Sequence, residues 1–154
     1  MKANNGTGNT SSRDEWQTPD SLFSRLNKQY SFSFDCCATK ENAKCLGYSS
    51  DFLSVERVDG CPSWMNLPFS KASAMFEHFF GIVDTGVAIY RCDNMETKVW
   101  QKSIFPIASW IFILAGRVKF DGFVGSNPRF PVALIGFNTQ PPIQVDGVLL
   151  KTNQ

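Results

Sequence analysis

Asn66, Leu67, Pro68 and Phe69 form the segment of this chain whose residue types are best suited to chemistry. The Asn66 side chain and the neighbouring backbone carbonyls bring oxygen atoms that accept hydrogen bonds, and Phe69 adds a flat aromatic ring. Pro68 stiffens the turn. The segment lies between a predicted strand and a predicted helix, and in parallel sheets ligands bind outside the carboxyl ends of the strands. It therefore predicts a binding site whose polar groups face a cleft.

The residues that most often bind metal ions are few and poorly spaced. The chain has one histidine, His78, no H-E-x-x-H motif, and five cysteines without a C-x-x-C pair: Cys36, Cys37, Cys45, Cys61 and Cys92. We therefore expect no metal site and no secreted disulfide framework, and we expect reduced thiols. His78 lies off the apolar stripe of its predicted helix, which favours a solvated surface histidine over a catalytic one.

Composition is typical of one globular domain. The chain has 154 residues, of which 43% are hydrophobic and 19% charged, with a formal net charge of +1. This excludes a histone-like or polycationic protein and extensive disorder. The charge is unevenly distributed, however: residues 1–97 hold nine basic and twelve acidic residues, and residues 98–154 hold six basic and two acidic ones. A surface that contacts a polyanion is therefore expected in the C-terminal third.

The elements before and after the Asn66 segment follow from residue spacing. Residues 1–13 are polar and read as a flexible leader, ahead of one domain over residues 14–154. Pro19 opens a helix with Thr18 as its N-cap, and residues 31–34 alternate into a strand that ends at Asp35. A second short strand is expected at 44–46. Apolar residues at helical spacing predict a helix from Ser70: Ala72, Met75, Phe76, Phe79 and Phe80.

The C-terminal half is predicted to contain more strands than helices. We expect strands at 87–90, 110–114, 118–120 and 131–137, a helix at 97–104 and a loop at 122–128. Strands that alternate with helices and then follow one another predict an α/β fold, doubly wound, with a mostly parallel sheet and a C-terminal antiparallel hairpin. The longest apolar stretch, residues 104–114, is too short to span a bilayer.

The Asn66 segment resembles the (Asp/Asn)-Pro-Pro-(Tyr/Phe) motif of amino-group DNA methyltransferases. Around it, residues 14–19 (DEWQTP), 34–38 (FDCCA) and 42–45 (NAKC) resemble the N-terminal half of the phage-type DNA N6-adenine methyltransferases, the Dam-like family of bacteriophages and prophages. Residues 97–100 (TKVW), 113–120 (ILAGRVKF) and 130–131 (FP) resemble that family's later blocks. The blocks follow the family's order over about residues 14–138, and the resemblance implies a Rossmann-like, S-adenosylmethionine-dependent methyltransferase fold.

The resemblance assigns catalytic roles to four residues. The Asn66 side-chain oxygen and the Leu67 carbonyl are expected to accept hydrogen bonds from the adenine amino group, with Pro68 holding the turn. Phe69 is expected to stack on an adenine that has left the duplex. Such acceptors localise the nitrogen lone pair, and the sulfonium of S-adenosylmethionine needs no acid to leave, so alignment and polarisation do most of the work.

The resemblance also implies a cofactor site. Asp35 and Cys36 are expected beside S-adenosylmethionine, where Cys36 keeps the turn narrow. Asp51 and Phe52 are expected to receive the cofactor's adenine, and Trp16, Thr18 and Pro19 to lie near its methionine end, with Asn66 at the shared boundary. The alternative for Asp35 and Asp51 is a strand-end cap or a solvated loop carboxylate.

Leu67 departs from the family pattern, which usually has proline at that position. The residue before Pro68 is still restricted to extended geometry, and its carbonyl is retained. Unlike proline, leucine does not restrict φ, and it adds an N–H donor. The catalytic turn could therefore be less rigid, and an inactive site is the alternative to an active enzyme.

Cations in the C-terminal part are predicted to contact DNA phosphates: Lys98, Lys102, Arg117, Lys119 and Arg129. The alternative is a solvated basic face, or, for Arg117, a role in fixing the hairpin turn. No separate target-recognition domain fits in the chain, so sequence preference must come from short loops and is expected to be low.

The sequence thus predicts a DNA adenine N6-methyltransferase that uses S-adenosylmethionine and acts on double-stranded DNA, with no metal and no membrane segment. As a phage- or prophage-encoded protein it is expected in the host cytoplasm, as a monomer or weak homodimer, and to protect DNA from restriction. Three alternatives remain: an inactive relative that binds cofactor or DNA, a cytosine-N4 methyltransferase, and a protein-interaction module on the same fold.

Overall fold

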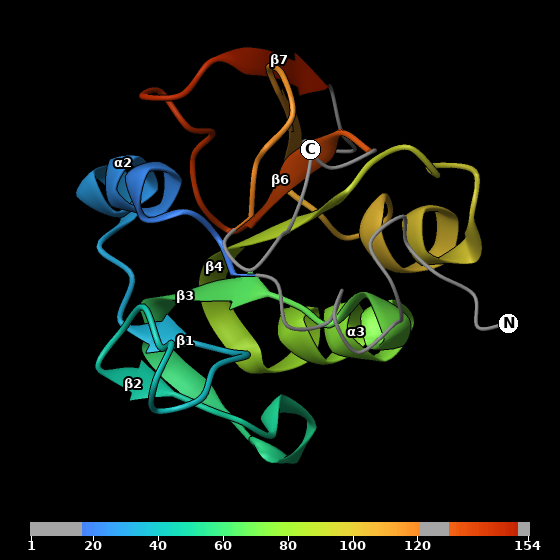
Figure 1. Ribbon diagram of the computed structural model, residues 1–154. Helices are drawn as coiled ribbons and strands as arrows, with labels where there is room; N and C mark the ends of the chain where they lie inside the picture. The colour runs from blue at the N-terminus through green and yellow to red at the C-terminus, as the bar shows by residue number, and fades with distance from the viewer. Residues whose placement is uncertain (1–16, 121–129, 151–154) are drawn as a thin grey trace, which may run out of the picture.

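Seven strands form one mixed sheet in the computed structural model, which describes residues 17–120 and 130–150 (Figure 1). The strands are β1 Phe34–Asp35, β2 Gly47–Tyr48, β3 Val58–Asn66, β4 Val83–Arg91, β5 Trp110–Leu114, β6 Val132–Phe137 and β7 Gly147–Leu150. The helices are α2 Asp20–Tyr30, α3 Ala72–Ile82, the 3-10 turns η1 Phe52–Ser54 and η2 Phe69–Lys71, and the π-helix η3 Val99–Ile104.

The order of the strands divides the sheet into a parallel and an antiparallel part. It runs β2-β1-β3-β4-β6-β5-β7, and the first four strands are parallel. β6 is antiparallel to both β4 and β5, and β7 is antiparallel to β5. Consequently β5 points the same way as β4. The carboxyl ends of β1, β3, β4 and β5 meet at one edge, here called the carboxyl edge, and the opposite edge is called the amino edge.

Both faces of the sheet are buried because successive side chains alternate between two cores. Met65 belongs to the core beneath α3 and η3, and its neighbour Trp64 belongs to the core beneath α2. The same alternation holds in the antiparallel part, where Ile111 faces the α3 side and Phe112 the α2 side. Residues at the carboxyl edge therefore project from a sheet that is packed on both sides.

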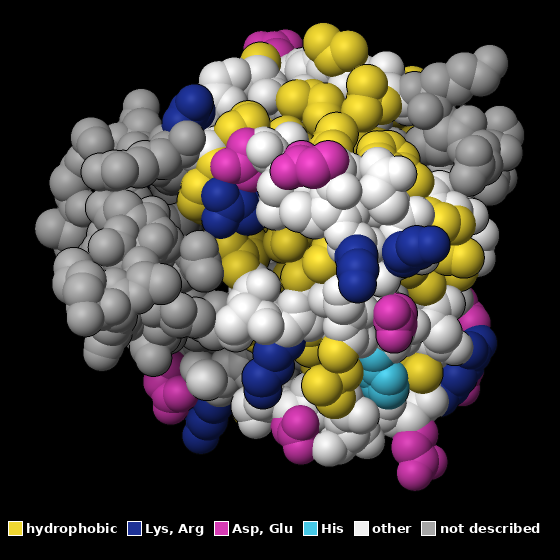
Figure 2. Space-filling model, turned by 90° about the vertical axis from the view of Figure 1, so that its right-hand side faces the viewer, with side chains coloured by type: hydrophobic (Ala, Val, Ile, Leu, Met, Phe, Trp, Pro, Cys, Tyr) yellow, Lys and Arg dark blue, Asp and Glu magenta, His cyan; other side chains and the backbone are white. Residues whose placement is uncertain are grey.

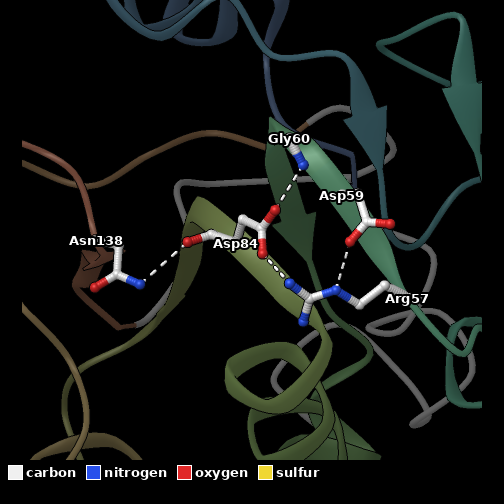
Figure 3. A network of polar contacts seen from close by, with 5 residues as sticks. All are labelled: Arg57, Asp59, Gly60, Asp84 and Asn138. Atoms are coloured by element: carbon white, nitrogen blue, oxygen red, sulfur yellow. Dashed lines mark hydrogen bonds and ion pairs between the residues drawn. The ribbon is translucent and has the colours of Figure 1, made fainter.

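A network of polar contacts ties the amino edge together (Figure 3). Arg57 pairs with Asp59 and with the carboxylate of Asp84, whose other oxygen accepts a hydrogen bond from the Gly60 amide at 2.6 Å. The Asn138 side chain donates to the Asp84 carbonyl at 3.1 Å. Gly60 has a φ of 70°, which glycine adopts without strain. These contacts join the starts of β3 and β4 to the chain that follows β6.

The predicted α/β class is confirmed, as are strands close to 87–90, 110–114 and 131–137 and the helix that follows Ser70. The predicted strand at 44–46 is wrong: β2 begins at Gly47, because the Lys44 amide is instead bound by the Asp35 carboxylate. The predicted helix at 97–104 is present as the π-helix η3. The flexible leader 1–13 and the loop 122–128 lie outside the described residues.

The predicted hairpin is a three-stranded antiparallel unit instead, and residues 118–120 form no strand. β7 pairs with β5 and so takes the position that a strand at 118–120 needed. Phe120 is nevertheless 2% exposed, because it packs in the α2-side core. Thr18 is not the N-cap of α2 either; Pro19 holds that position, without a side-chain cap bond.

Candidate active site

A pocket of about 650 Å³ lies at the carboxyl edge, where β1 and β3 end. It is lined by the chain before α2, the turn after β1, η1 and the start of α3. The pocket brings together residues that are far apart in the sequence and that were predicted as site residues: Thr18, Asp35, Cys36, Asp51, Phe52, Asn66 and Pro68. Pro19, Leu67 and Phe69 are not among its lining residues, and Trp16 lies outside the described part of the chain.

The Asn66 wall of the pocket is the end of β3. Asn66 pairs with Ile89 of β4, and its Nδ2 donates to Thr18 Oγ1 at 3.1 Å. Pro68 is extended, with φ −66° and ψ 122°, and its carbonyl accepts a hydrogen bond from the Lys71 amide at 3.1 Å. The long central strand, the proline and the first turn of helix together fix where the Asn66 amide lies.

The side chains of Leu67 and Phe69 pack against other parts of the protein. The Leu67 side chain is 3% exposed and packs in the core beneath α3. Phe69 is half-buried and meets Tyr90 and Phe130 edge-on, with ring centroids 5.4 Å and 5.7 Å away. Of the predicted tetrapeptide, Asn66 and Pro68 line the pocket, whereas the Leu67 side chain lies in the core.

The Asp35 wall is held by its buried carboxylate, which is 3% exposed. The two oxygens accept hydrogen bonds from the backbone amides of Cys37, at 3.3 Å, and Lys44, at 2.9 Å. Burial raises the pKa of Asp35 to about 6, although both hydrogen bonds act in the opposite direction. Asp35 therefore ties down the loop between β1 and β2, which is the strand-end role that the sequence left as an alternative to cofactor contact.

Two cysteines follow Asp35 in this wall. Cys36 is fully buried and Cys37 half-buried, and burial raises the pKa of both thiols well above the ordinary range. The cysteines of the described residues are free thiols, as expected from the sequence. Because thiolates are the reactive form, Cys36 and Cys37 act here as small apolar wall residues.

η1 forms the third side of the pocket. Asp51 is exposed, and its carboxylate accepts a hydrogen bond from Ser54 Oγ at 2.6 Å, while Phe52 is 3% exposed. His78 lies on α3 outside the pocket lining, as expected, but it is half-buried rather than fully solvated: its Nε2 lies 2.7 Å from the Val55 carbonyl, and its ring meets Phe52 edge-on. This contact holds η1 against α3.

Sequence reasoning missed several lining residues, of which Lys44 is the most informative. Its Nζ pairs with Asp20 at 2.5 Å, so the start of α2 is linked to the loop that Asp35 holds. Gln17, Trp64, Lys71 and Met75 also line the pocket. No local signal marks these residues, because they meet only through the sheet topology.

The predicted DNA contacts lie outside the pocket. Lys98, Lys102, Arg117 and Lys119 are exposed, and Arg129 is outside the described residues. Hydrogen bonding by Arg91 lowers the pKa of Asp93, and the nearby charge of Arg117 lowers it further, which sets Arg117 near the end of β4. Figure 2, viewed from the side of α3 and η3, shows basic and acidic side chains interspersed on that face.

Within residues 17–120 and 130–150, no three histidine, cysteine, aspartate or glutamate side chains lie close enough to hold a metal ion. In the same residues, no helix has the length and apolar character needed to cross a membrane.

Comparison with known proteins identifies a family for the chain. No individual curated protein matches the chain. A family model described as DNA N-6-adenine-methyltransferase (Dam) matches residues 5–128, well over half of the chain, and the matched region includes every described residue that lines the pocket. The resemblance seen in the sequence is thereby confirmed, and the chain belongs to the DNA N-6-adenine-methyltransferase (Dam) family.

Proposed function

We propose that the protein transfers a methyl group from S-adenosylmethionine to the N6 amino group of adenine in DNA. Membership of the Dam family supports the reaction class. The observation that carries the proposal is the Asn66 amide, which ends a central strand, lines the pocket and is held by Thr18. The parallel unit from β1 to β4, with a pocket at its carboxyl ends, supports a Rossmann-like methyltransferase fold.

The lining residues fit S-adenosylmethionine, which carries a sulfonium, a zwitterionic amino-acid group and an adenine ring. Asp51 brings a carboxylate, Lys71 brings an ammonium group, and Phe52 brings an aromatic wall. The volume of about 650 Å³ lies in the range of small-molecule sites, roughly 300–1,000 Å³.

Within this pocket each side has a different proposed task. Asp51 and Phe52 hold the cofactor's adenine, with the carboxylate accepting from the adenine amino group. The turn through Cys36 lies against the cofactor because its small buried side chain leaves the wall thin. Asp35 supports that turn through its two backbone hydrogen bonds.

The catalytic task falls to two oxygen atoms at the end of β3. When bound, S-adenosylmethionine supplies an electrophilic methyl carbon on a sulfonium that leaves without an acid. The amino nitrogen of adenine is a poor nucleophile because its lone pair is delocalised into the ring. Asn66 Oδ1 and the Leu67 carbonyl accept hydrogen bonds from its two N–H groups, so the lone pair becomes localised on the nitrogen. When the N–C bond forms and the S–C bond breaks, the products are S-adenosylhomocysteine and N6-methyladenine, and one amino proton is released to solvent. The stiff Pro68 turn keeps the two acceptors in place.

The target adenine reaches these acceptors only after it leaves the duplex. In the proposal Phe69 stacks on the extruded base, and its edge-on packing against Tyr90 and Phe130 keeps the ring from turning. The carboxyl ends of β4 and β5 are followed by three cations, Lys98, Arg117 and Lys119. In the proposal these side chains contact DNA phosphates on the side of the molecule where the pocket lies. Double-stranded DNA is therefore the proposed partner.

The test is methyl transfer from tritiated S-adenosylmethionine to DNA prepared without adenine methylation, followed by digestion and separation of the nucleosides. We expect the label in N6-methyladenine, with the same DNA methylated beforehand as the control. Label in N4-methylcytosine would show instead that the protein methylates the amino group of cytosine. If no label is found although S-adenosylhomocysteine binds in calorimetry, the protein is an inactive relative and the proposal fails.

A further inference from the structure

Thr18 has a buried hydroxyl that its own helix does not use. The residue is 1% exposed, and the N-cap of α2 is Pro19, without a side-chain cap bond. The Thr18 hydroxyl instead accepts the hydrogen bond from Asn66 Nδ2, 48 residues away in the sequence. Because a buried hydroxyl without a partner destabilises the folded state, this contact is expected to persist.

The direction of that hydroxyl is set by the backbone. Threonine has few χ1 rotamers because it is β-branched, and Pro19 restricts Thr18 to extended geometry. The segment is anchored on both sides, since Asp20 pairs with Lys44 and the far end of α2 bonds to the chain after β6 through Tyr30. Thr18 is therefore a fixed partner for the Asn66 amide.

The two ends of an asparagine amide are nearly the same in shape, so hydrogen-bond partners decide which end points where. With Nδ2 engaged by Thr18, Oδ1 is the end that the proposed function directs at the adenine amino group. In the opposite orientation, Asn66 Nδ2 would face the adenine amino group, so two N–H donors would meet and Oδ1 could not accept a hydrogen bond from the base. We propose, on the basis of the proposed function, that Thr18 is a positioning residue that holds the Asn66 amide in place through the hydrogen bond from its Nδ2 rather than a ligand of the cofactor's methionine end.

Thr18→Val tests this, because valine keeps the shape and removes the hydroxyl. We expect kcat to fall about tenfold to hundredfold, with S-adenosylhomocysteine affinity and the KM for DNA within about twofold of wild type. Thr18→Ser restores the hydroxyl and is expected to recover most of kcat. Thr85→Val is the matched control, since it removes a hydroxyl that bonds to the Asn138 carbonyl at the amino edge, and its kcat is expected to match wild type.

Weaker S-adenosylhomocysteine binding with an unchanged kcat would show that the hydroxyl serves the cofactor and would overturn the inference. If the wild-type protein transfers no methyl group, the proposed function fails separately, and the hydrogen bond is tested by a double-mutant cycle on unfolding with Thr18→Val and Asn66→Ala. We expect the two changes to be coupled about fivefold or more in the unfolding equilibrium constant. Additive effects would mean that Thr18 does not hold Asn66, and the inference would be withdrawn.

Discussion

Asn66 and Asp35 both end strands at the carboxyl edge, yet different forces hold them in place. Asn66 ends a nine-residue strand between two packed cores, and the turn after it is stiffened by proline. Asp35 ends a two-residue strand, and its wall depends on a buried carboxylate that binds two backbone amides. One wall of the pocket is fixed by packing and the other by electrostatics.

The two walls should therefore be sensitive to different changes. Packing is insensitive to pH, whereas a buried carboxylate responds to protonation and to the loss of either oxygen. The wall built by packing is the one proposed to do chemistry, where small displacements cost the most rate. The wall held by Asp35 is proposed to bind the cofactor, and its effects should appear in affinity and stability.

Asn66→Ala should have the largest effect on turnover. Removing the side-chain acceptor is expected to lower kcat about 10²- to 10³-fold, because one of the two oxygens that polarise the amino group is lost. Calorimetry with S-adenosylhomocysteine should give nearly unchanged binding, and circular dichroism an unchanged fold. Near-normal methyl transfer in this variant would refute the role given to Asn66.

Asp35→Asn should change how stability depends on pH. The pKa of Asp35 is raised from 3.8 to about 6, so protonation is favoured in the folded state. Its contribution to stability is full below about pH 3.8 and is lost as the pH rises through about 6. Asparagine does not titrate. Denaturant unfolding at pH 7 and pH 4 should therefore show the difference between wild type and variant shifting by about 2 kcal/mol in favour of wild type at pH 4. A constant difference would mean that Asp35 is not the titrating group.

Asp51→Ala should weaken binding of the cofactor without lowering the rate of methyl transfer. Loss of a hydrogen bond to a charged group is expected to raise the Kd for S-adenosylhomocysteine about tenfold or somewhat more. At saturating S-adenosylmethionine, kcat should stay near wild type. Asp59→Ala is the control, because it removes an exposed carboxylate at the amino edge. Equal binding in both variants would remove Asp51 from the cofactor site.

Leu67→Pro tests whether the departure from the family motif only loosens the turn. The Leu67 side chain packs in the core, so the substitution is expected to cost about 2 kcal/mol of stability. Methyl transfer per folded molecule should be equal to or higher than wild type, since the carbonyl stays and φ becomes restricted. A collapse of the rate at low temperature, where the variant is folded, would make the leucine itself part of the site.

Lys98→Ala and Lys119→Ala should have the smallest effects. Each is expected to reduce the slope of log Kd for DNA against log salt by about 0.9, which is the effect of one lost phosphate contact. Lys28→Ala, near the amino-edge end of α2, should leave the slope unchanged. Fluorescence anisotropy at several salt concentrations measures this slope. Unchanged slopes for both variants would mean that the two lysines are solvated and do not contact DNA.

Much of the fold could be predicted because its signals are local. The apolar runs of β4, β5 and β6 and the helical spacing in α3 are visible within ten residues. β7 was missed because Gly147–Leu150 is only four residues long and follows a turn-rich segment, so nothing local indicates its pairing with β5.

The site was predicted in part for the same reason. Asn66 and Asp35 follow predicted strands, so their shared edge could be deduced, and family resemblance pointed to Asp51 and Phe52. The contacts that orient these residues could not be deduced. Thr18 is predicted to be a helix cap until the fold brings Asn66 to it, and nothing in the sequence places His78 against the Val55 carbonyl.

Helix α2 links the pocket to the segment that follows β6. At one end it begins beside Thr18, and at the other Tyr30 and Gln29 bond to the carbonyls of Gln140 and Pro141. A protein shortened before Gln140 would lose the far support of the helix as well as β7. Substitutions in the segment after β6 are therefore expected to affect the position of the reaction centre through α2.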